Sequence, residues 1–168
     1  MWRCWRTARS CIRSRALLRA CPSHRVRRTA TEHRGEHLDE ADLYDNVRPA
    51  LTALRQAGVR VVIAGNQTAR AGELLRDLDL PADVIATSGD WGVAKPRTEF
   101  FHRVLEIAQA PAERTLYVGD HPANDIGPAS AAGLRTAHLH RGPWGHLWAD
   151  QDAAAAADWR IDIAVLGR

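Results

Sequence analysis

Long apolar stretches are missing from this chain of 168 residues. No run approaches the roughly 18–20 apolar residues that a helix needs to cross a bilayer, so we expect no membrane partner. Cysteine is also scarce, and the three that occur, Cys4, Cys11 and Cys21, all lie near the amino terminus. An odd number of cysteines, with none in the rest of the chain, argues against a disulfide framework and predicts a reducing, cytoplasmic location.

Lysine occurs only once. Lys95 stands in the stretch VAKP, residues 93–96, and the other 22 of the 23 basic side chains are arginine. An ammonium is a compact charge on a flexible stem, whereas a guanidinium is a planar fork, so the two are not interchangeable at an anion site. Lys95 is therefore a candidate functional residue, with coincidence as the alternative.

Acidic residues are scarce near the amino terminus. Residues 1–37 contain ten arginines and two glutamates, and the first aspartate is Asp39, whereas the rest of the chain has 13 basic and 18 acidic residues. We therefore divide the chain into an arginine-rich arm, residues 1–40, which its composition predicts to be unstructured, and an α/β core domain, residues 41–168.

Two other interpretations of the arm stay open. It has the arginine content and near absence of acids of a targeting peptide. It could also bind nucleic acid, because clustered arginines neutralise phosphates, and we expect nucleic acid binding only through this arm. The oligomeric state leaves no signal in the sequence.

From residue 42 onward, helical and strand patterns alternate. Apolar residues at helical spacing predict helices over 47–57, 68–78, 96–108 and 122–133, and the alanine run 153–157 predicts a last one. Short apolar runs predict strands over 59–64, 84–87, 115–119 and 135–139, with a final strand after the alanine run. This alternation is typical of an α/β fold with a mostly parallel sheet.

Polar residues follow the predicted strands. Gly65-Asn66 comes after the first strand, Lys95-Pro96 a few residues after the second, and GDHPAND, residues 119–125, contains Asp120 and Asp125 after the third. Ligands of open α/β sheets gather at the carboxyl ends of the strands, so these residues should converge. Two carboxylates, one ammonium and backbone amides are suited to a divalent cation and a phosphate together.

In this order, the three segments resemble the second, third and fourth motifs of the haloacid dehalogenase superfamily, whose members are mostly Mg²⁺-dependent phosphohydrolases. The resemblance runs from about Asp42 to about Gly145, and GDHPANDIGPASAAGLRTA is its most specific part. It implies a Rossmann-like three-layer α/β/α fold, Mg²⁺ as cofactor and a small-molecule phosphate ester as substrate.

The resemblance also implies roles for single residues. Asp120 would bind the metal, and Asp125 would be a second acid that ligates through water or orients other ligands. Lys95 would neutralise the substrate phosphate and the acyl-phosphate intermediate. Gly65 and Asn66 would hold phosphate oxygen through their amides. Each residue also has a purely structural interpretation, as a helix cap, a helix start or a turn.

The chain departs from the family pattern in two places. Gly65 stands where the family usually has a serine or threonine. The nucleophilic aspartate of a DxD motif, which ends a central first strand in the family, has no counterpart before Asp39. We therefore expect a fold that lacks this central strand and the cap domain, either with unpaired strand edges or with the neighbouring strands forced together.

Three hypotheses follow. The first is a Mg²⁺-dependent phosphatase that acts through an aspartyl-phosphate intermediate, in an N-terminally incomplete chain that would be inactive on its own. The second is a non-catalytic pseudoenzyme module that binds phosphate and Mg²⁺. The third is nucleic acid binding by the arm, with the domain as a scaffold.

Overall fold

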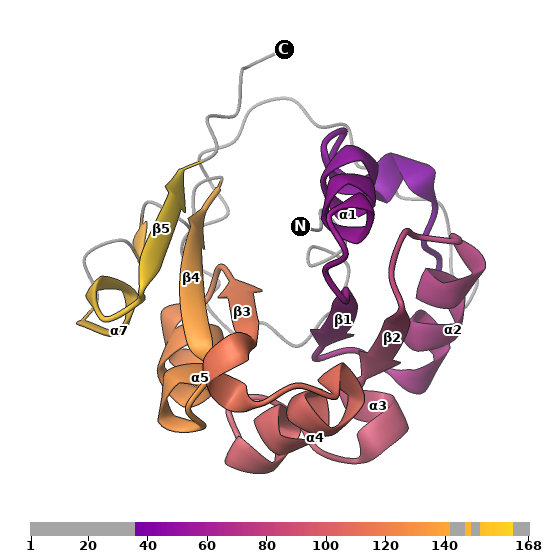
Figure 1. Cartoon of the computed structure of the whole chain (residues 1–168). Helices are drawn as coiled ribbons and strands as arrows, with labels where there is room; N and C mark the ends of the chain where they lie inside the picture. The colour runs from indigo at the N-terminus through magenta and orange to yellow at the C-terminus, as the bar shows by residue number, and fades with distance from the viewer. Residues whose placement is uncertain (1–35, 142–146, 149–151, 163–168) are drawn as a thin grey trace, which may run out of the picture.

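The computed structural model describes residues 36–141, 147–148 and 152–162. It confirms the α/β class (Figure 1), because helices alternate with short strands and every strand pair is parallel. In these ranges no helix has the length and apolarity that a bilayer crossing requires. The predicted arm lies outside the described residues up to position 35, and the boundary at residue 40 stays a prediction.

The first half of the domain contains a two-stranded sheet. Its elements are η2 (Glu40–Asp42), α1 (Val47–Gln56), β1 (Val62–Gly65), α2 (Ala69–Asp77), β2 (Val84–Thr87) and α3 (Ser88–Trp91). β1 pairs with β2, with Val62 opposite Val84 and Gly65 opposite Thr87. Asp39 caps η2 by accepting a hydrogen bond from the amide of Ala41.

The second half contains a three-stranded sheet. Its elements are α4 (Thr98–Ala108), η3 (Ala112–Arg114), β3 (Leu116–Gly119), the π-helical turn η4 (Pro122–Ile126), α5 (Gly127–Ala131), β4 (Arg135–His140), α7 (Asp152–Ala155) and β5 (Trp159–Asp162). The strand order is β3-β4-β5. Gly133, with φ of +84°, follows α5 in the left-handed conformation that glycine adopts easily.

The two sheets do not join into one. β1 and β3 lie on opposite sides of a gap, with α3 and α4 below it (Figure 1). Among the described residues no strand pairs with the facing edges of β1 and β3, so the single sheet that the sequence predicted is divided. Of the two outcomes expected from a missing central strand, the described part of the chain shows the unpaired edges.

Two apolar cores hold the halves. The first lies between α1, α2 and the β1–β2 sheet and is centred on Val47, Leu75 and Leu80. Leu38 belongs to it, although it precedes the predicted domain boundary. The second is centred on Phe100 and Phe101 of α4, which pack against Tyr117 of β3 and, at its margin, Ala64 of β1. α4 therefore connects the two sheets.

Most predicted elements are confirmed to within a few residues. Two differ. The helix expected to open at Pro96 begins at Thr98, and the short helix α3 was not predicted. The segment predicted as one helix over 122–133 starts as the π-helical turn η4 and becomes α-helical only at Gly127.

Candidate functional site

Lys95 and Asp125 form a buried ion pair where β1 and β3 end. The Lys95 Nζ and the Asp125 Oδ1 are 2.6 Å apart, and each side chain is 3% exposed. Lys95 comes from the loop before α4, whereas Asp125 lies on η4, directly after β3. The ends of β1, β2 and β3, with the residues that follow them and Lys95, are called the carboxyl edge below.

Lys95 is held as a cation. Burial lowers the pKa of its ammonium, but the charge of Asp125 and the contact with Tyr117 raise it, and the net value is about 12. The Tyr117 hydroxyl is buried as well, and burial raises the pKa of Tyr117 to about 12. Tyr117 is therefore a neutral phenol beside a charged lysine at neutral pH.

Asn66 positions the backbone of Lys95. The Asn66 Oδ1 accepts a hydrogen bond from the Lys95 amide at 2.8 Å, and the Asn66 Nδ2 donates to the Lys95 carbonyl at 3.0 Å. This pair of bonds joins the turn after β1 to the loop before α4. The side chain of Asn66 thus supports Lys95, a role that the sequence did not predict.

Asp125 approaches β3 so closely that only glycine fits beside it. A Cβ on Gly119 would lie 2.6 Å from the Asp125 Cγ, which is shorter than real contacts of a Cβ atom. The Asp125 Oδ2 accepts a hydrogen bond from the His121 amide at 3.0 Å. Both oxygens of Asp125 therefore already have a donor, one from Lys95 and one from His121.

Asp120 is the second carboxylate of the edge. Burial, and next the negative charge of Asp125, raise the pKa of Asp120 above its usual value. His138 is fully buried, and its Nε2 lies 3.2 Å from the carbonyl oxygen of Asp120. The Nδ1 of His138 lies 2.8 Å from the Nε2 of His140. A bound cation would favour the charged form of Asp120, which burial and the charge of Asp125 oppose.

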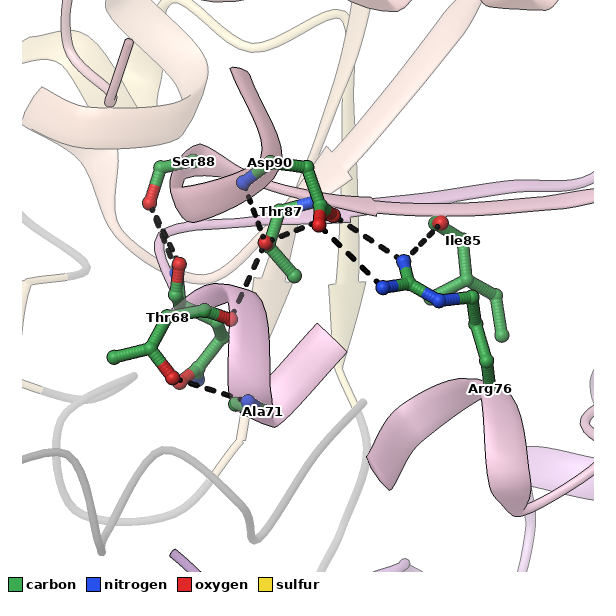
Figure 2. A network of polar contacts seen from close by, with 8 residues as sticks. Thr68, Ala71, Arg76, Ile85, Thr87, Ser88 and Asp90 are labelled. Atoms are coloured by element: carbon green, nitrogen blue, oxygen red, sulfur yellow. Dashed lines mark hydrogen bonds and ion pairs between the residues drawn. The ribbon is translucent and has the colours of Figure 1, made fainter. Parts of the chain in front are cut away.

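The turn after β1 is fixed by the network in Figure 2. Thr68 caps α2, and its carbonyl accepts from the Thr87 hydroxyl at 3.3 Å. The carboxylate of Asp90 accepts from the amide and the hydroxyl of Thr87 at 2.8 and 2.9 Å, and it also pairs with Arg76. The Ser88 hydroxyl bonds to the backbone of Gln67 at 3.1 and 3.0 Å. These bonds tie the ends of β1 and β2 together and fix the segment next to Gly65.

A cavity of about 960 Å³ extends from the carboxyl edge into the gap between the sheets. At the carboxyl edge its lining includes Gly65, Thr87, Lys95, Gly119, Asp120 and Asp125. Further along the gap it is lined by apolar side chains of α1, β1 and β3. The candidate site is thus one end of a cavity large enough for a small molecule.

The carboxylate oxygens at the carboxyl edge are ligands that suit Mg²⁺ better than a softer metal. Carboxylate oxygens are hard ligands, and Mg²⁺ keeps several waters while one or two protein carboxylates hold it. In the described part of the chain, no group of three histidine, cysteine, aspartate or glutamate side chains is placed to hold a metal. Asp120 and Asp125 fit a site of this open kind and do not fit a closed structural site.

The structure brings the predicted site residues Lys95, Asp125 and Asp120 to one edge, with Gly65 and Asn66 beside them. Sequence reasoning missed Tyr117, although a tyrosine two residues before Gly119 in a strand faces the same side as that glycine. It also missed His138, whose contact with Asp120 comes from the pairing of β3 with β4.

Comparison with known proteins agrees with these motifs. The profile of the haloacid dehalogenase-like hydrolase family matches residues 5–133, and so extends into the arginine-rich arm. The chain is 33% identical over 100 residues to haloacid dehalogenase-like hydrolase domain-containing protein 3 of Xenopus laevis, covering 58% of this chain and 41% of that protein. It is 32% identical over 111 residues to the glyceraldehyde 3-phosphate phosphatase of Methanocaldococcus jannaschii, covering 64% and 49%.

Among solved structures, the HAD-hydrolase YfnB from Bacillus subtilis, bound to magnesium, is similar with a TM-score of 0.60 and 27% identity. The match covers 71% of this chain and 52% of that one. The chain thus spans about half the length of the proteins it matches. The order of its motifs, its parallel strands and the family profile agree, and the chain belongs to the haloacid dehalogenase-like hydrolase family.

Proposed function

We propose that the carboxyl edge is the phosphate- and magnesium-binding part of a phosphatase site that acts on a small phosphate ester. The observation that carries the proposal is the ion pair of Lys95 with Asp125, 2.6 Å long and almost fully buried. A buried ion pair is a poor source of stability compared with apolar residues of similar volume, so its presence calls for another role. Its place at the ends of two parallel strands is where α/β proteins bind ligands.

In this proposal Lys95 supplies a permanent positive charge. Its pKa of about 12 keeps the ammonium charged at any physiological pH. An ammonium has three N–H donors and can bind Asp125 and a phosphoryl oxygen together. Lys95 would thus neutralise charge on the phosphate, while Asn66 fixes its position and Gly65 leaves room for the phosphate to approach the backbone.

Asp120 and Asp125 would hold the metal. Mg²⁺ would neutralise the two carboxylates and polarise a phosphoryl oxygen. Asp120 would be the direct ligand, because both oxygens of Asp125 already accept hydrogen bonds. Asp125 would act through water or by orienting Lys95. The curated relative in Methanocaldococcus jannaschii is named as a phosphatase, and the YfnB structure is described as bound to magnesium.

A second candidate function is binding without turnover. No aspartate precedes Asp39 in the chain, and attack on phosphorus through an aspartyl-phosphate requires a carboxylate nucleophile. The chain would then bind Mg²⁺ and a phosphate compound but would not hydrolyse it. The few cysteines support a reducing compartment, for which we propose the cytoplasm.

The experiment is a thermal-unfolding titration with MgCl₂ and inorganic phosphate, combined with an assay of p-nitrophenyl phosphate hydrolysis. We expect Mg²⁺ and phosphate to raise the melting temperature together, and Asp120→Asn to abolish this effect. Glu73→Gln, which changes an exposed carboxylate on α2, is the matched control and should leave it intact. Hydrolysis would identify an enzyme, and stabilisation without hydrolysis would identify a binding module. An unchanged melting temperature at millimolar Mg²⁺ and phosphate would contradict both functions.

A further inference from the structure

The peptide group that joins Asp120 to His121 is bonded on both of its sides. Its carbonyl oxygen, which belongs to Asp120, lies 3.2 Å from the Nε2 of His138. Its N–H, which belongs to His121, donates to the Oδ2 of Asp125 at 3.0 Å. A peptide group is planar and rigid, so a contact that fixes the carbonyl also fixes the amide. The partner of the carbonyl therefore bears on how Asp125 is held.

That partner, His138, is the inner end of a row of three side chains on neighbouring strands, called the histidine row below. His138 and His140 lie two residues apart on β4 and so face the same side of the sheet, and Asp162 of β5 is the ladder partner of His140 (Figure 1). The Nδ1 of His138 is 2.8 Å from the Nε2 of His140, and the Nδ1 of His140 is 2.9 Å from the Asp162 Oδ1. His138 is fully buried, whereas the Asp162 side chain is 79% exposed, so the row runs from the interior to the surface.

The acceptors at the two ends of the row decide which tautomer His138 adopts. A carbonyl oxygen can only accept, so the contact with Asp120 is a hydrogen bond only if the Nε2 of His138 carries a proton. Burial lowers the pKa of His138, which keeps the ring neutral at neutral pH and leaves its Nδ1 as an acceptor. The Nε2–H of His140 then donates to that Nδ1, and the carboxylate of Asp162 accepts from the other side of the His140 ring.

We propose that His138 is a positioning residue of the carboxyl edge, which fixes the peptide group between Asp120 and His121 through its Nε2–H. The outer members of the histidine row keep His138 in the tautomer that can donate. Asp125 is the partner of Lys95 in the buried ion pair, so a line of hydrogen bonds connects the surface of β5 with the ammonium of the site. A role of this line in ligand binding rests on the proposed function, whereas the line itself does not.

The alternative orientation of the peptide group shows what His138 prevents. If the group turned over, its carbonyl oxygen would face the carboxylate of Asp125, and neither could donate to the other. Asp125 would lose one of its two donors, and the backbone that carries Asp120 would change direction. Hydrogen bonds in a line also polarise one another, so a donor on the carbonyl makes the His121 amide a stronger donor to Asp125.

The first test is ¹⁵N NMR of the histidine rings at neutral pH, in the full chain without metal or phosphate. We expect His138 to show a protonated Nε2 and a bare Nδ1. Asp162→Ala should shift the ring signals of both His140 and His138, because it removes the outer end of the row. Asp152→Ala, which changes an exposed carboxylate at the start of α7, should leave them in place. A proton on the Nδ1 of His138 instead of the Nε2, or a His138 signal that ignores Asp162→Ala, would overturn the proposal.

Two replacements of His138 separate its hydrogen bond from its packing. His138→Leu fills the space without a donor, whereas His138→Gln keeps an N–H group near the place of the Nε2. Hydrogen exchange of the His121 amide, relative to that of the Val104 amide in α4, should be about tenfold faster in His138→Leu and within about threefold of the wild type in His138→Gln. Leu134→Ala, which truncates a buried side chain before β4, is the matched control and should speed both amides by the same factor. Equal behaviour of the leucine and glutamine variants would show that His138 only packs.

A titration with MgCl₂ then relates the histidine row to the proposed function. Loss of a group that orients a metal ligand typically weakens metal binding about 10–100-fold, so His138→Leu should raise the MgCl₂ concentration for half-maximal thermal stabilisation at least about tenfold. An unchanged midpoint would contradict the positioning role. A chain with the expected tautomer and exchange rates that Mg²⁺ does not stabilise would contradict the proposed function and leave the row intact. If His138→Leu fails to fold, the ring signals of the unaltered chain and of Asp162→Ala decide.

Discussion

Replacement of Lys95 by methionine tests whether the buried ion pair behaves as its geometry implies. Methionine keeps a long, unbranched side chain and removes the charge. Asp125 would then remain buried, with the His121 amide as the donor to its Oδ2. Removing one partner of a buried ion pair costs about 3–5 kcal/mol in the free energy of unfolding, because an uncompensated charge is left behind. That is a large share of the stability of an ordinary domain.

The double variant separates the charge from the packing. Lys95→Met with Asp125→Leu removes both charges, and apolar replacements of a buried ion pair are often neutral or stabilising by about 1–4 kcal/mol. We therefore expect the double variant to be at least about 2 kcal/mol more stable than the single one. Urea unfolding at neutral pH, followed by circular dichroism, gives these free energies.

The control is the ion pair of Arg70 with Glu73. Its Nη1–Oε2 distance is 2.7 Å, nearly the same as in the buried pair, but its side chains are 60% and 58% exposed. Arg70→Met should leave the free energy of unfolding unchanged within error, since water replaces the lost partner. If Lys95→Met proved equally harmless, or if the double variant were no more stable than the single one, the site would be open to water and our account of Lys95 would be wrong.

Three further predictions concern neighbouring residues. Asp120→Asn should raise the melting temperature in metal-free buffer at neutral pH, because burial and the charge of Asp125 raise the pKa of Asp120 and so make its charged form destabilising. The gain should shrink as the pH falls and the wild-type carboxyl takes up its proton. A lower melting temperature for the variant at neutral pH would contradict this prediction. Gly119→Ala should lower the free energy of unfolding by about 1–3 kcal/mol, because the new Cβ meets Asp125, and a variant as stable as the wild type in urea unfolding would refute the contact. Asp90→Asn should destabilise the protein at neutral pH, because hydrogen bonds from Arg76 and Thr87 outweigh burial and lower the pKa of Asp90 in the folded protein. The stabilisation is present above about pH 3.8, the ordinary pKa of the carboxyl, and is lost as the pH falls through the pKa of the folded protein. A difference in melting temperature that persisted in stronger acid would contradict this prediction.

Much of the fold could be predicted from local patterns. The strand 84–87 was predicted with its observed bounds, and the helix over 68–78 differs from α2 by one residue at each end. Such elements carry their own signals, here a β-branched run and the cap formed by Thr68. The helix α3 was missed because its signal is a short polar sequence, in which Thr87 and Asp90 form a capping box after a strand.

The residues of the site could be predicted from the sequence, but the contacts between them could be predicted only in part. Lys95, Asp120 and Asp125 were identified because they follow strands, and residues of that kind meet in a parallel sheet. That Asn66 binds the backbone of Lys95 with its side chain could not be deduced, because it depends on the loop before α4 lying beside the turn after β1. The open gap between the sheets was one of the two outcomes predicted from the missing first-strand motif, and the sequence could not decide between them, because the choice depends on how α4 holds the sheets.

Each sheet is formed from one uninterrupted stretch of chain, which bears on the order of folding. Val62 pairs with Val84, and Leu116 pairs with Arg135, so these strand pairs form between residues that lie close together in the sequence. During synthesis the β1–β2 unit is complete before β3 has been made. The contact between Lys95 and Asp125 joins the two units, and we expect it to form after each is built. A weaker contact there should speed unfolding while leaving the folding rate nearly unchanged. In this order of events, the carboxyl edge would be the last part of the molecule to assemble and the first to separate.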